Sequence, residues 1–444
     1  MTQSNWAAFL ERHFQLSARG TTVRTEVVAG VTTFLAMAYI VVVNPAILSQ
    51  AGMPIAAVAA ATCFSAGFAT LLMGLSANIP LALAPGMGLN AYFTFTVVKQ
   101  LGVPWEVALG CVFLSGIAFL FLTLTGVRQV IIAALPRFMF PAIAGGIGLF
   151  ITFIGLHNAN IVTAHPVTLV TLGDLKAPGA ALALVGLVLI VALHLWNVRG
   201  AVLIGILAIT GLGWALGQAN MTPQPYDIAA LADTALKLDI PGVFAPSMAV
   251  SLLEIVFVFL FVDLFDNIGT LVGVAKRANL VKPDGSIERL NRILFVDATA
   301  TVVGSMAGTS TVTSYVESAA GVQAGGRTGL TSVVTGVLFL LAMLAAPYAQ
   351  LIPIYATAPA LILVGGLMMS QMAEVPWDDF MVSIPAFLTL VMIPLTFSIA
   401  NGLAFGIMAY ALLKLLSGKL QKTDWLLMTL AVIFIVRFVY LSAG

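Results

Sequence analysis

Charged residues are scarce in this chain. Only 8% of its 444 residues are Asp, Glu, Lys or Arg, and 60% are hydrophobic. In a typical soluble domain about 25% of the residues are charged. The mean hydropathy of +1.07 excludes a soluble globular protein and indicates a polytopic protein that lies in a lipid bilayer. The net charge of +1 gives no reason to expect a nucleic-acid partner.

Cysteine and histidine, which often bind metals or act in catalysis, are also rare. Cys63 and Cys111 lie in apolar segments without metal-ligand spacing, and we interpret both as ordinary buried thiols. The first twenty residues contain no apolar h-region, so we expect no cleavable signal peptide. The sequence predicts no enzyme, no metal site and no bound cofactor, because the four histidines are scattered: His13, His157, His165 and His194.

Apolar stretches of about 20 residues, separated by turn or charge signals, predict fourteen membrane spans. A further stretch, 425–442, is long enough to cross the bilayer, and the sequence leaves open whether it crosses or lies along the interface. No linker separates a soluble domain. The predicted spans are 25–44, 56–77, 80–99, 105–126, 138–156, 178–197, 200–218, 247–275, 289–306, 309–324, 326–347, 351–372, 382–399 and 401–418.

The positions of lysine and arginine orient these spans. With a cytoplasmic N-terminus, only Lys99, Lys176 and Lys237 fall on the outer side. This positive-inside bias supports fourteen crossings with both ends of that unit inside, in a multi-pass protein of the inner cell membrane. The fifteen cytoplasmic residues are Arg12, Arg19, Arg24, Arg128, Arg137, Arg199, Lys276, Arg277, Lys282, Arg289, Arg292, Arg327, Lys414, Lys419 and Lys422.

Parts of the two halves of the chain resemble each other. "FPAIAGGIGLF" (140–150) is similar to "APALILVGGLMM" (358–369), and "NVRGAVLIGILA" (197–208) is similar to "SIANGLAFGIMA" (398–409). Both matches lie about seven spans apart, and an odd number of spans inverts the second copy, as in many transporters. The alternative is a coincidence between glycine-rich helices.

The third and tenth spans are poor helices. "NIPLALAPGMGLNAYFTF" (78–95) contains two prolines and two glycines, and "GSMAGTSTVTSYVESAAG" (304–321) is rich in Ser, Thr and Gly. Broken segments at matching places in two halves indicate a transporter's binding site, because irregular backbone at that depth must line a cavity or be buried in protein. The alternative for Gly86 and Gly88 is that they only allow close helix packing.

Two carboxylates interrupt the eighth span at "LFVDLFDNIGT" (260–270). Each costs roughly 2.5–3.5 kcal/mol on insertion, whereas each Leu, Ile, Phe or Val returns only about 0.3–0.6 kcal/mol. Asp263, Asp266, Asn267 and Thr270 share one broad helix face, and Glu317 lies in the tenth span. We expect these acids to face protein or water. Two further acids are interpreted mainly as structural groups that cap helices: Asp297 and Glu254.

The residue types around these acids favour a neutral, flat, N–H-rich solute. Lys and Arg within the fourteen spans lie near span ends, so no deep cation would hold an anion. Carboxylates accept hydrogen bonds from N–H groups, and Asn90 adds a donor and an acceptor. A buried acid near a second acid takes up a proton readily, which would couple transport to a proton gradient. Aromatic faces for stacking are Tyr92, Phe93, Phe95 and Tyr315.

Four longer motifs resemble the AzgA-like purine permeases of the nucleobase–ascorbate transporter superfamily, also called nucleobase:cation symporters. The resemblance covers the chain from residue 18 to residue 420. The motifs are "GTTVRTEVVAGVTTFLAMAYIVVVNPAIL" (20–48), "LALAPGMGLNAYF" (81–93), "VDLFDNIGTLVGV" (262–274) and "GTSTVTSYVESAAGVQAGGRTGL" (308–330).

This resemblance implies fourteen transmembrane helices in two inverted repeats of seven, with a short strand and a half helix in each of spans 3 and 10. It implies a core domain (1–126 and 247–347) and a gate domain (127–246 and 348–422), followed by an apolar tail, 423–444. Such permeases import adenine, guanine or hypoxanthine with protons, through alternating access of core against gate, often as homodimers.

By motif position, the resemblance places the site acids at Asp263, Asp266 and Glu317 and a third-span polar residue at Asn90. Asp263 and Glu317, with Asn90, are expected to hold the N–H edge of a base. Asp263, Asp266 or Glu317 would carry the proton. Phe93 and Tyr315 complete the expected substrate site, and the supporting residues are Gly86, Gly88, Asn267, Thr270, Thr309 and Ser310.

Three alternatives belong to other classes of protein. An anion transporter of the same architecture would require a cation or helix N-termini in the site. A membrane-embedded enzyme would require a nucleophile–base pair or a metal cluster. A channel would require rings of charge, and these acids are few and scattered.

Overall fold

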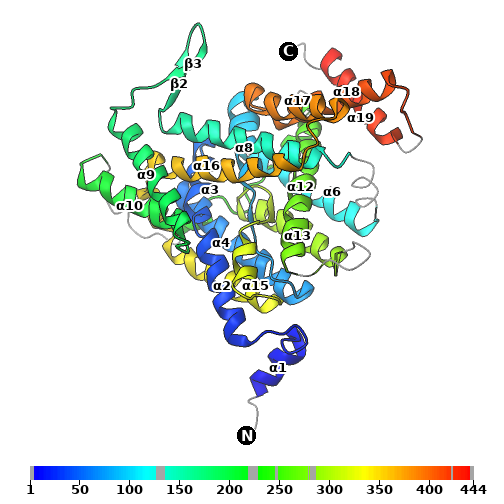
Figure 1. Ribbon diagram of the computed structural model, residues 1–444. Coiled ribbons are helices and arrows are strands. Elements are labelled where there is room, and N and C mark those ends of the chain that lie inside the picture. The colour runs from blue at the N-terminus through cyan, green and yellow to red at the C-terminus, as the bar shows by residue number, and fades with distance from the viewer. Residues whose placement is uncertain are drawn as a thin grey trace.

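Helices make up most of the protein, with two short pairs of strands among them (Figure 1). The computed structural model describes residues 5–126, 136–218, 229–245, 249–278, 280, 287–421 and 424–440. Within these residues, a helix or a strand–helix unit lies at every predicted span and at 425–442. Eight described helical segments have the length and composition to cross a membrane, and shorter apolar helices accompany them. The predicted helical, polytopic membrane protein is confirmed.

Several spans of the first half of the chain are interrupted. The first span is divided into α2 and α3, and the second ends in a π-helical turn, Met73–Ala77. In the third span, β1 (Leu83–Pro85) leads into a one-turn helix that continues as a π-helix, Tyr92–Gln100. The helices are α1 (Asn5–Phe14), α2 (Val23–Met37), α3 (Ile40–Leu48), α4 (Ile55–Leu72), α5 (Met87–Ala91), α6 (Trp105–Leu124), α8 (Met139–Asn158), α9 (Pro178–Leu195) and α10 (Ala201–Ala215).

The second half has the same succession of long helices, with a break in the tenth span. There β4 (Val312–Ser314) precedes a short helix. The helices are α11 (Ile240–Val243), α12 (Ala249–Arg277), α13 (Leu290–Ala307), α14 (Ser318–Gln323), α15 (Gly329–Ala342), α16 (Ile354–Met369), α17 (Phe380–Thr396), α18 (Ile399–Leu416) and α19 (Trp425–Tyr440).

A hairpin of two strands projects from the molecule after α8, at the top of Figure 1. β2 (Val162–His165) pairs antiparallel with β3 (Leu169–Leu172). The sequence analysis did not predict it. A half-buried strand is signalled in a sequence by alternating apolar and polar residues, one face of which becomes buried. All four residues of β3 are exposed, so no such alternation exists there.

Helix contacts repeat between the two halves of the chain. α4 packs against α15 as α13 packs against α6, and α2 packs against α15 as α12 packs against α6. α8 packs against α16, while the hairpin α9–α10 lies on α16 and the hairpin α17–α18 lies on α8. Each contact has a counterpart made by the elements seven spans further along, as two inverted repeats of seven require.

A buried carboxylate, Glu26 of α2, ties that helix to the beginning of α15. It accepts hydrogen bonds from the N–H groups of Arg327 (2.8 Å), Thr328 (3.3 Å) and Thr331 (3.2 Å), and from the Thr331 hydroxyl (2.6 Å). The first N–H groups of a helix have no partner within the helix, and negative charge is favoured there. Glu26 therefore caps α15 from 301 residues away.

We expect Glu26→Gln to lower the thermal unfolding midpoint of the detergent-solubilised protein. The new amide would turn a donor toward backbone N–H groups, and losing hydrogen bonds to a charged acceptor costs roughly 1.5–3 kcal/mol of unfolding free energy. The matched control is Glu374→Gln, since Glu374 is exposed. Equal midpoints for the two variants would contradict the capping role.

Candidate functional site

The broken third and tenth spans meet in a completely buried pair of strands. β1 and β4 are antiparallel, with Leu83 opposite Ser314 and Pro85 opposite Val312. α5 follows β1 and α14 follows β4, so the two half helices leave the strand pair at opposite ends. The predicted strand plus half helix in each of these spans is confirmed.

Hydroxyl groups from neighbouring helices bond the strand backbone. Irregular backbone is tolerated at membrane depth only where protein satisfies its N–H and C=O groups. The strands themselves pair through few residues, so side chains of α4, α13, α14 and α15 supply the remaining partners. These bonds join Leu83 N to Thr70 Oγ1 (3.0 Å), Leu81 N to Ser332 Oγ (2.9 Å), Ala82 N to Ser318 Oγ (3.0 Å) and Val312 N to Thr301 Oγ1 (3.3 Å).

Glu317 immediately precedes α14 and is half-buried. The hydroxyl of Tyr39 donates a hydrogen bond to its Oε1 (2.6 Å). Tyr39 is 1% exposed and lies at the break between α2 and α3. Among the described residues, no other side chain hydrogen-bonds Glu317. One carboxylate oxygen is therefore held in place, and the carboxylate is not covered completely by protein.

Asp263 lies in the middle of α12 and is only 2% exposed. Its Oδ2 is 3.3 Å from the hydroxyl oxygen of Thr301 on α13, and that oxygen also lies 3.1 Å from the carbonyl oxygen of Val312. One hydroxyl thus contacts both the acid and β4. α12 packs against β4, α14 and α5, which places Asp263 beside the strand crossing.

Asn90 lies on α5 and is completely buried. Its Oδ1 accepts a hydrogen bond from the Ser310 hydroxyl, which comes from the segment just before β4. Its Nδ2 has no hydrogen-bond partner among the described residues. Tyr315 follows β4 and donates its hydroxyl to the carbonyl oxygen of Pro85 (2.5 Å). Asn90, Ser310 and Tyr315 thereby link the third span to the tenth.

The other expected residues lie around this crossing. Phe93 is completely buried, with its ring 6.4 Å from that of Phe259 on α12. Thr309 accepts a hydrogen bond from Asn44 of α3 (3.0 Å), and Asn267 accepts one from Ser314 (3.5 Å). The remaining positions are on the same elements: Thr270 is half-buried on α12, Gly86 N donates to Thr311 O (2.9 Å), and the side chain of Asp266 lies outside the described residues.

Gly88 lies at a close contact between α5 and α8. A Cβ atom on Gly88 would lie 2.5 Å from Cγ2 of Ile147, which is shorter than any normal contact. α5 and α8 belong to different groups of packed helices, since α8 lies with α16, α17 and α18. This glycine therefore allows α5 and α8 to pack closely, and the contact lies beside Asn90.

Two acids interpreted as helix caps do not cap helices. Asp297 is completely buried in the middle of α13, well beyond its first turn. Glu254 lies within α12 and forms an ion pair with Arg437 of α19 (2.6 Å). The cap interpretation is wrong for both, because α13 begins seven residues before Asp297 and α12 begins five residues before Glu254, so neither acid lies in a first turn.

The sequence analysis missed Tyr39, Thr301 and Asn44, which hold residues of the site. Tyr39 and Asn44 carried a signal, since each is a polar group within an apolar span, and Asn44 precedes Pro45. Thr301 carried none, because a threonine is common in membrane helices and can bond its own backbone. The partners of Tyr39 and Asn44 come from distant spans, and that of Thr301 comes from the preceding span.

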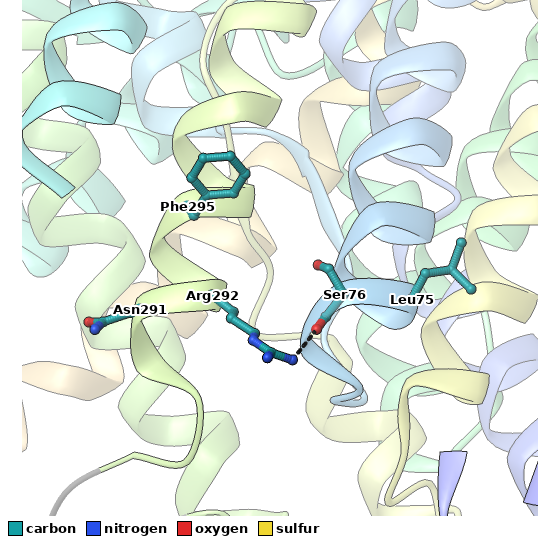
Figure 2. A pocket seen from close by; sticks show the side chains of 5 residues that line it. All are labelled: Leu75, Ser76, Asn291, Arg292 and Phe295. Atoms are coloured by element: carbon teal, nitrogen blue, oxygen red, sulfur yellow. Dashed lines mark hydrogen bonds between the residues drawn. The ribbon is translucent and has the colours of Figure 1, made fainter. Parts of the chain in front are cut away.

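A surface groove of about 520 Å³ lies away from the strand crossing, between the end of the second span and the start of α13 (Figure 2). Arg292 points toward Ser76 and donates a hydrogen bond to its carbonyl oxygen (3.2 Å). No expected site residue lines this groove, whose walls are Leu75, Ser76, Asn291, Arg292 and Phe295. The expected site residues lie around the strand crossing instead.

The chain matches known proteins along nearly its whole length. Residues 24–430 match the model of a permease family. The chain is 50% identical to a putative permease of Methanocaldococcus jannaschii (MJ0326), over 98% of this chain and 99% of that one. It is 44% identical to the adenine permease AdeP of Escherichia coli, over 100% and 98%. It is 42% identical to the guanine/hypoxanthine permease PbuG of Bacillus subtilis, over 98% and 100%.

Two solved structures share the fold at low sequence identity. The transmembrane domain of the cyanobacterial bicarbonate transporter BicA is 18% identical, with a TM-score of 0.64, over 87% of this chain and 97% of that one. The murine anion transporter Slc26a9, in its inward-facing state, is 13% identical, with a TM-score of 0.65, over 94% and 73%. Both likenesses concern the fold alone.

We expect Gly88→Ala to lower the thermal unfolding midpoint, because the added methyl group would press on Ile147 of α8. Overpacking of this kind costs roughly 1–3 kcal/mol. Gly88→Ala should cost less in an Ile147→Ala background than in the original chain, since the atom that is struck is then absent. Gly366→Ala is the control, because a Cβ atom there meets nothing within 4 Å. An equal cost of Gly88→Ala in both backgrounds would argue against this contact.

Proposed function

The chain belongs to the nucleobase–ascorbate transporter family of permeases, and we propose that it imports purine nucleobases together with protons. The substrate class would be adenine, guanine or hypoxanthine. The observation that carries the proposal is a half-buried carboxylate, Glu317, held by Tyr39 where the broken third and tenth spans cross. The protein is a membrane transporter and not an enzyme.

The proposed recognition of the base uses its N–H edge. Tyr39 fixes one oxygen of Glu317, so the other oxygen is oriented to accept a hydrogen bond from a planar ligand. Asn90 offers an Nδ2 group that no described residue engages. Tyr315 and Phe93 belong to the same strand–helix units and would border the ring. Two relatives are an adenine permease and a guanine/hypoxanthine permease, which supports this substrate class.

Proton coupling is assigned to Asp263, Asp266 and Glu317. A carboxylate in hydrocarbon surroundings is disfavoured relative to its neutral form, so a proton that moves with the substrate removes the cost of the charge. Asp263 is nearly inaccessible and touches Thr301, whose hydroxyl also contacts β4. Uptake of a proton at Asp263 would therefore change its contact with Thr301, and through Thr301 the contact with the strand that lines the proposed site.

Alternating access would occur by movement of a core domain against a gate domain. α8, α9, α10, α16, α17 and α18 pack mainly with one another and form the proposed gate, residues 127–246 and 348–422. The proposed core, residues 1–126 and 247–347, contains both broken spans. We further propose that the N-terminus is cytoplasmic, the membrane is the inner one, and two copies associate as a homodimer.

An anion transporter of the same architecture is the second candidate. Two solved structures that share this fold are titled as a bicarbonate transporter and an anion transporter, which is the observation in its favour. The side chains weigh against it, because Glu317 and Asp263 would repel an anion. The ion pairs of the described Lys and Arg residues lie away from the strand crossing, at Arg19–Glu288, Arg289–Glu288, Lys414–Asp424 and Arg437–Glu254.

The function is tested by uptake of labelled hypoxanthine and adenine into cells that lack purine transport of their own. Unlabelled purines should compete, bicarbonate should not, and a protonophore should abolish accumulation. Accumulation that persists with the protonophore would refute proton coupling while leaving purine transport intact. Normal uptake by Asp263→Asn with loss of its pH dependence would assign this residue to the proton and not to the substrate.

Glu317→Gln and Tyr39→Phe test the substrate contact separately. A hydrogen bond to a charged group contributes roughly 1.5–3 kcal/mol, so Glu317→Gln should raise the half-saturating purine concentration by about tenfold or more. Tyr39→Phe only removes the hydrogen bond that holds the Glu317 carboxylate. It should raise the half-saturating purine concentration about two- to tenfold and leave the maximal uptake rate nearly unchanged. Thr357→Val, on α16, is the control, since Thr357 bonds only its own helix. Full affinity in Glu317→Gln would remove this residue from the site.

A further inference from the structure

The C-terminal helix α19 runs antiparallel beside α18 and is fixed to it at both ends (Figure 1). Lys414 Nζ is 2.5 Å from Asp424 Oδ1 at one end, and Arg437 Nη1 is 3.0 Å from Asn401 Oδ1 at the other. Thirteen residues separate the two contacts on each helix, which is about 20 Å of helix. α19 therefore lies at the same depth as α18.

The ion pair between Lys414 and Asp424 is supported by a further hydrogen bond to Asp424. Burial acts to raise the pKa of Asp424, but hydrogen bonds from Lys414 and from the N–H of Gln421 (2.8 Å) outweigh it and hold this pKa below its ordinary value. Asp424 thus stays charged at neutral pH, and its ion pair with Lys414 joins α18 to α19 as one unit. Both helices then move together.

At its other end α19 reaches a third helix. Arg437 Nη2 is 2.6 Å from Oε1 of Glu254 on α12, in addition to its bond to Asn401 of α18. Aromatic contacts of α19 also reach both helices. The ring centroids of Phe434 and Phe257 of α12 are 6.4 Å apart, and those of Phe438 and Phe405 of α18 are 5.5 Å apart. One guanidinium group therefore joins α12 to α18.

The position of this contact bears on transport because α12 carries Asp263. Glu254 precedes Asp263 by nine residues, which is about 14 Å along the helix. Under the proposed function α12 belongs to the core and α18 to the gate, so Arg437 bridges the two parts that must move. A bidentate guanidinium is suited to this, because its fork can hold a carboxylate and an amide oxygen at once.

We propose that Arg437 is a positioning residue that holds α12, and with it Asp263, against α18 in one state of the transport cycle. The Arg437–Glu254 contact separates when the core moves, while the Lys414–Asp424 contact stays closed throughout. This proposal rests on the proposed alternating access. It gives α19, which the fourteen-span plan does not include, a part in the movement.

The test is a reversible cross-link across each ion pair. Cys63→Ser and Cys111→Ser remove the two native thiols, both of which are buried. Into this chain are placed Glu254→Cys with Arg437→Cys or, as the matched control, Lys414→Cys with Asp424→Cys. A short, reductant-cleavable methanethiosulfonate cross-linker then joins either pair, and labelled adenine uptake is measured before cross-linking, after it and after reduction.

We expect the 254–437 cross-link to abolish uptake and reduction to restore it, whereas the 414–424 cross-link leaves uptake unchanged. Full uptake by protein shown to be cross-linked at 254–437 would overturn the proposal, and so would equal inhibition by both cross-links. Purine uptake is measured separately with the unmodified chain. If that chain takes up no purine, the proposed function is refuted, and not only the role of Arg437.

If the protein with cysteines at 254 and 437 takes up no adenine before cross-linking, variants that remove or exchange the two charges provide a second test. Glu254→Gln and Arg437→Gln should each change the maximal uptake rate and the half-saturating concentration together, because they shift the balance between two states. The double variant Glu254→Arg with Arg437→Glu should restore both toward the original values. Two single variants with unchanged kinetics would contradict a positioning role for Arg437.

Discussion

Every backbone N–H and C=O group in the hydrocarbon region needs a partner within the protein, and the centre of this molecule follows from that constraint. β1 and β4 could not be exposed to lipid, because each unpaired group costs several kcal/mol. They are completely buried, they pair with each other, and hydroxyl groups of Thr70, Thr301 and Ser332 bond the N–H groups that pairing leaves over. Serine and threonine on the neighbouring helices therefore permit two broken spans to cross inside a membrane protein.

The same hydroxyl groups connect the backbone to the carboxylates. Thr301 touches the carbonyl oxygen of Val312 and the carboxylate of Asp263, so the acid of α12 is linked to the strand by a single side chain. Tyr39 performs a similar task for Glu317 from the break in the first span. The contacts around Asp263 thus involve the eighth, ninth and tenth spans, and those of Glu317 involve the first and the tenth. A transporter requires such a connection between its ligand and its moving parts.

Much of this architecture could be predicted from the sequence. Apolar runs of fixed length gave the spans, and the prolines and glycines of the third span together with the Ser/Thr-rich tenth span indicated where helices break. The acids at Asp263 and Glu317 were found because charge is rare and costly in such segments. The caps expected of Asp297 and Glu254 were wrong, because both acids lie beyond the first turn of their helices, and Glu254 pairs with an arginine that follows the fourteenth span. Glu26 and Tyr39 were not identified, because a polar residue within an apolar span does not show which distant residue is its partner.

By itself the sequence determined that this chain lies in a membrane, where its spans fall and which of its carboxylates require protection. These properties are local, since hydrophobicity and helix periodicity are read within one segment. The tertiary structure alone decided the partners. Tyr39 and Glu317 are 278 residues apart, Glu26 caps a helix 301 residues away, and Arg437 joins α12 to α18. Which spans lie side by side depends on how the two repeats pack, and packing brings together side chains that no pattern within one span relates.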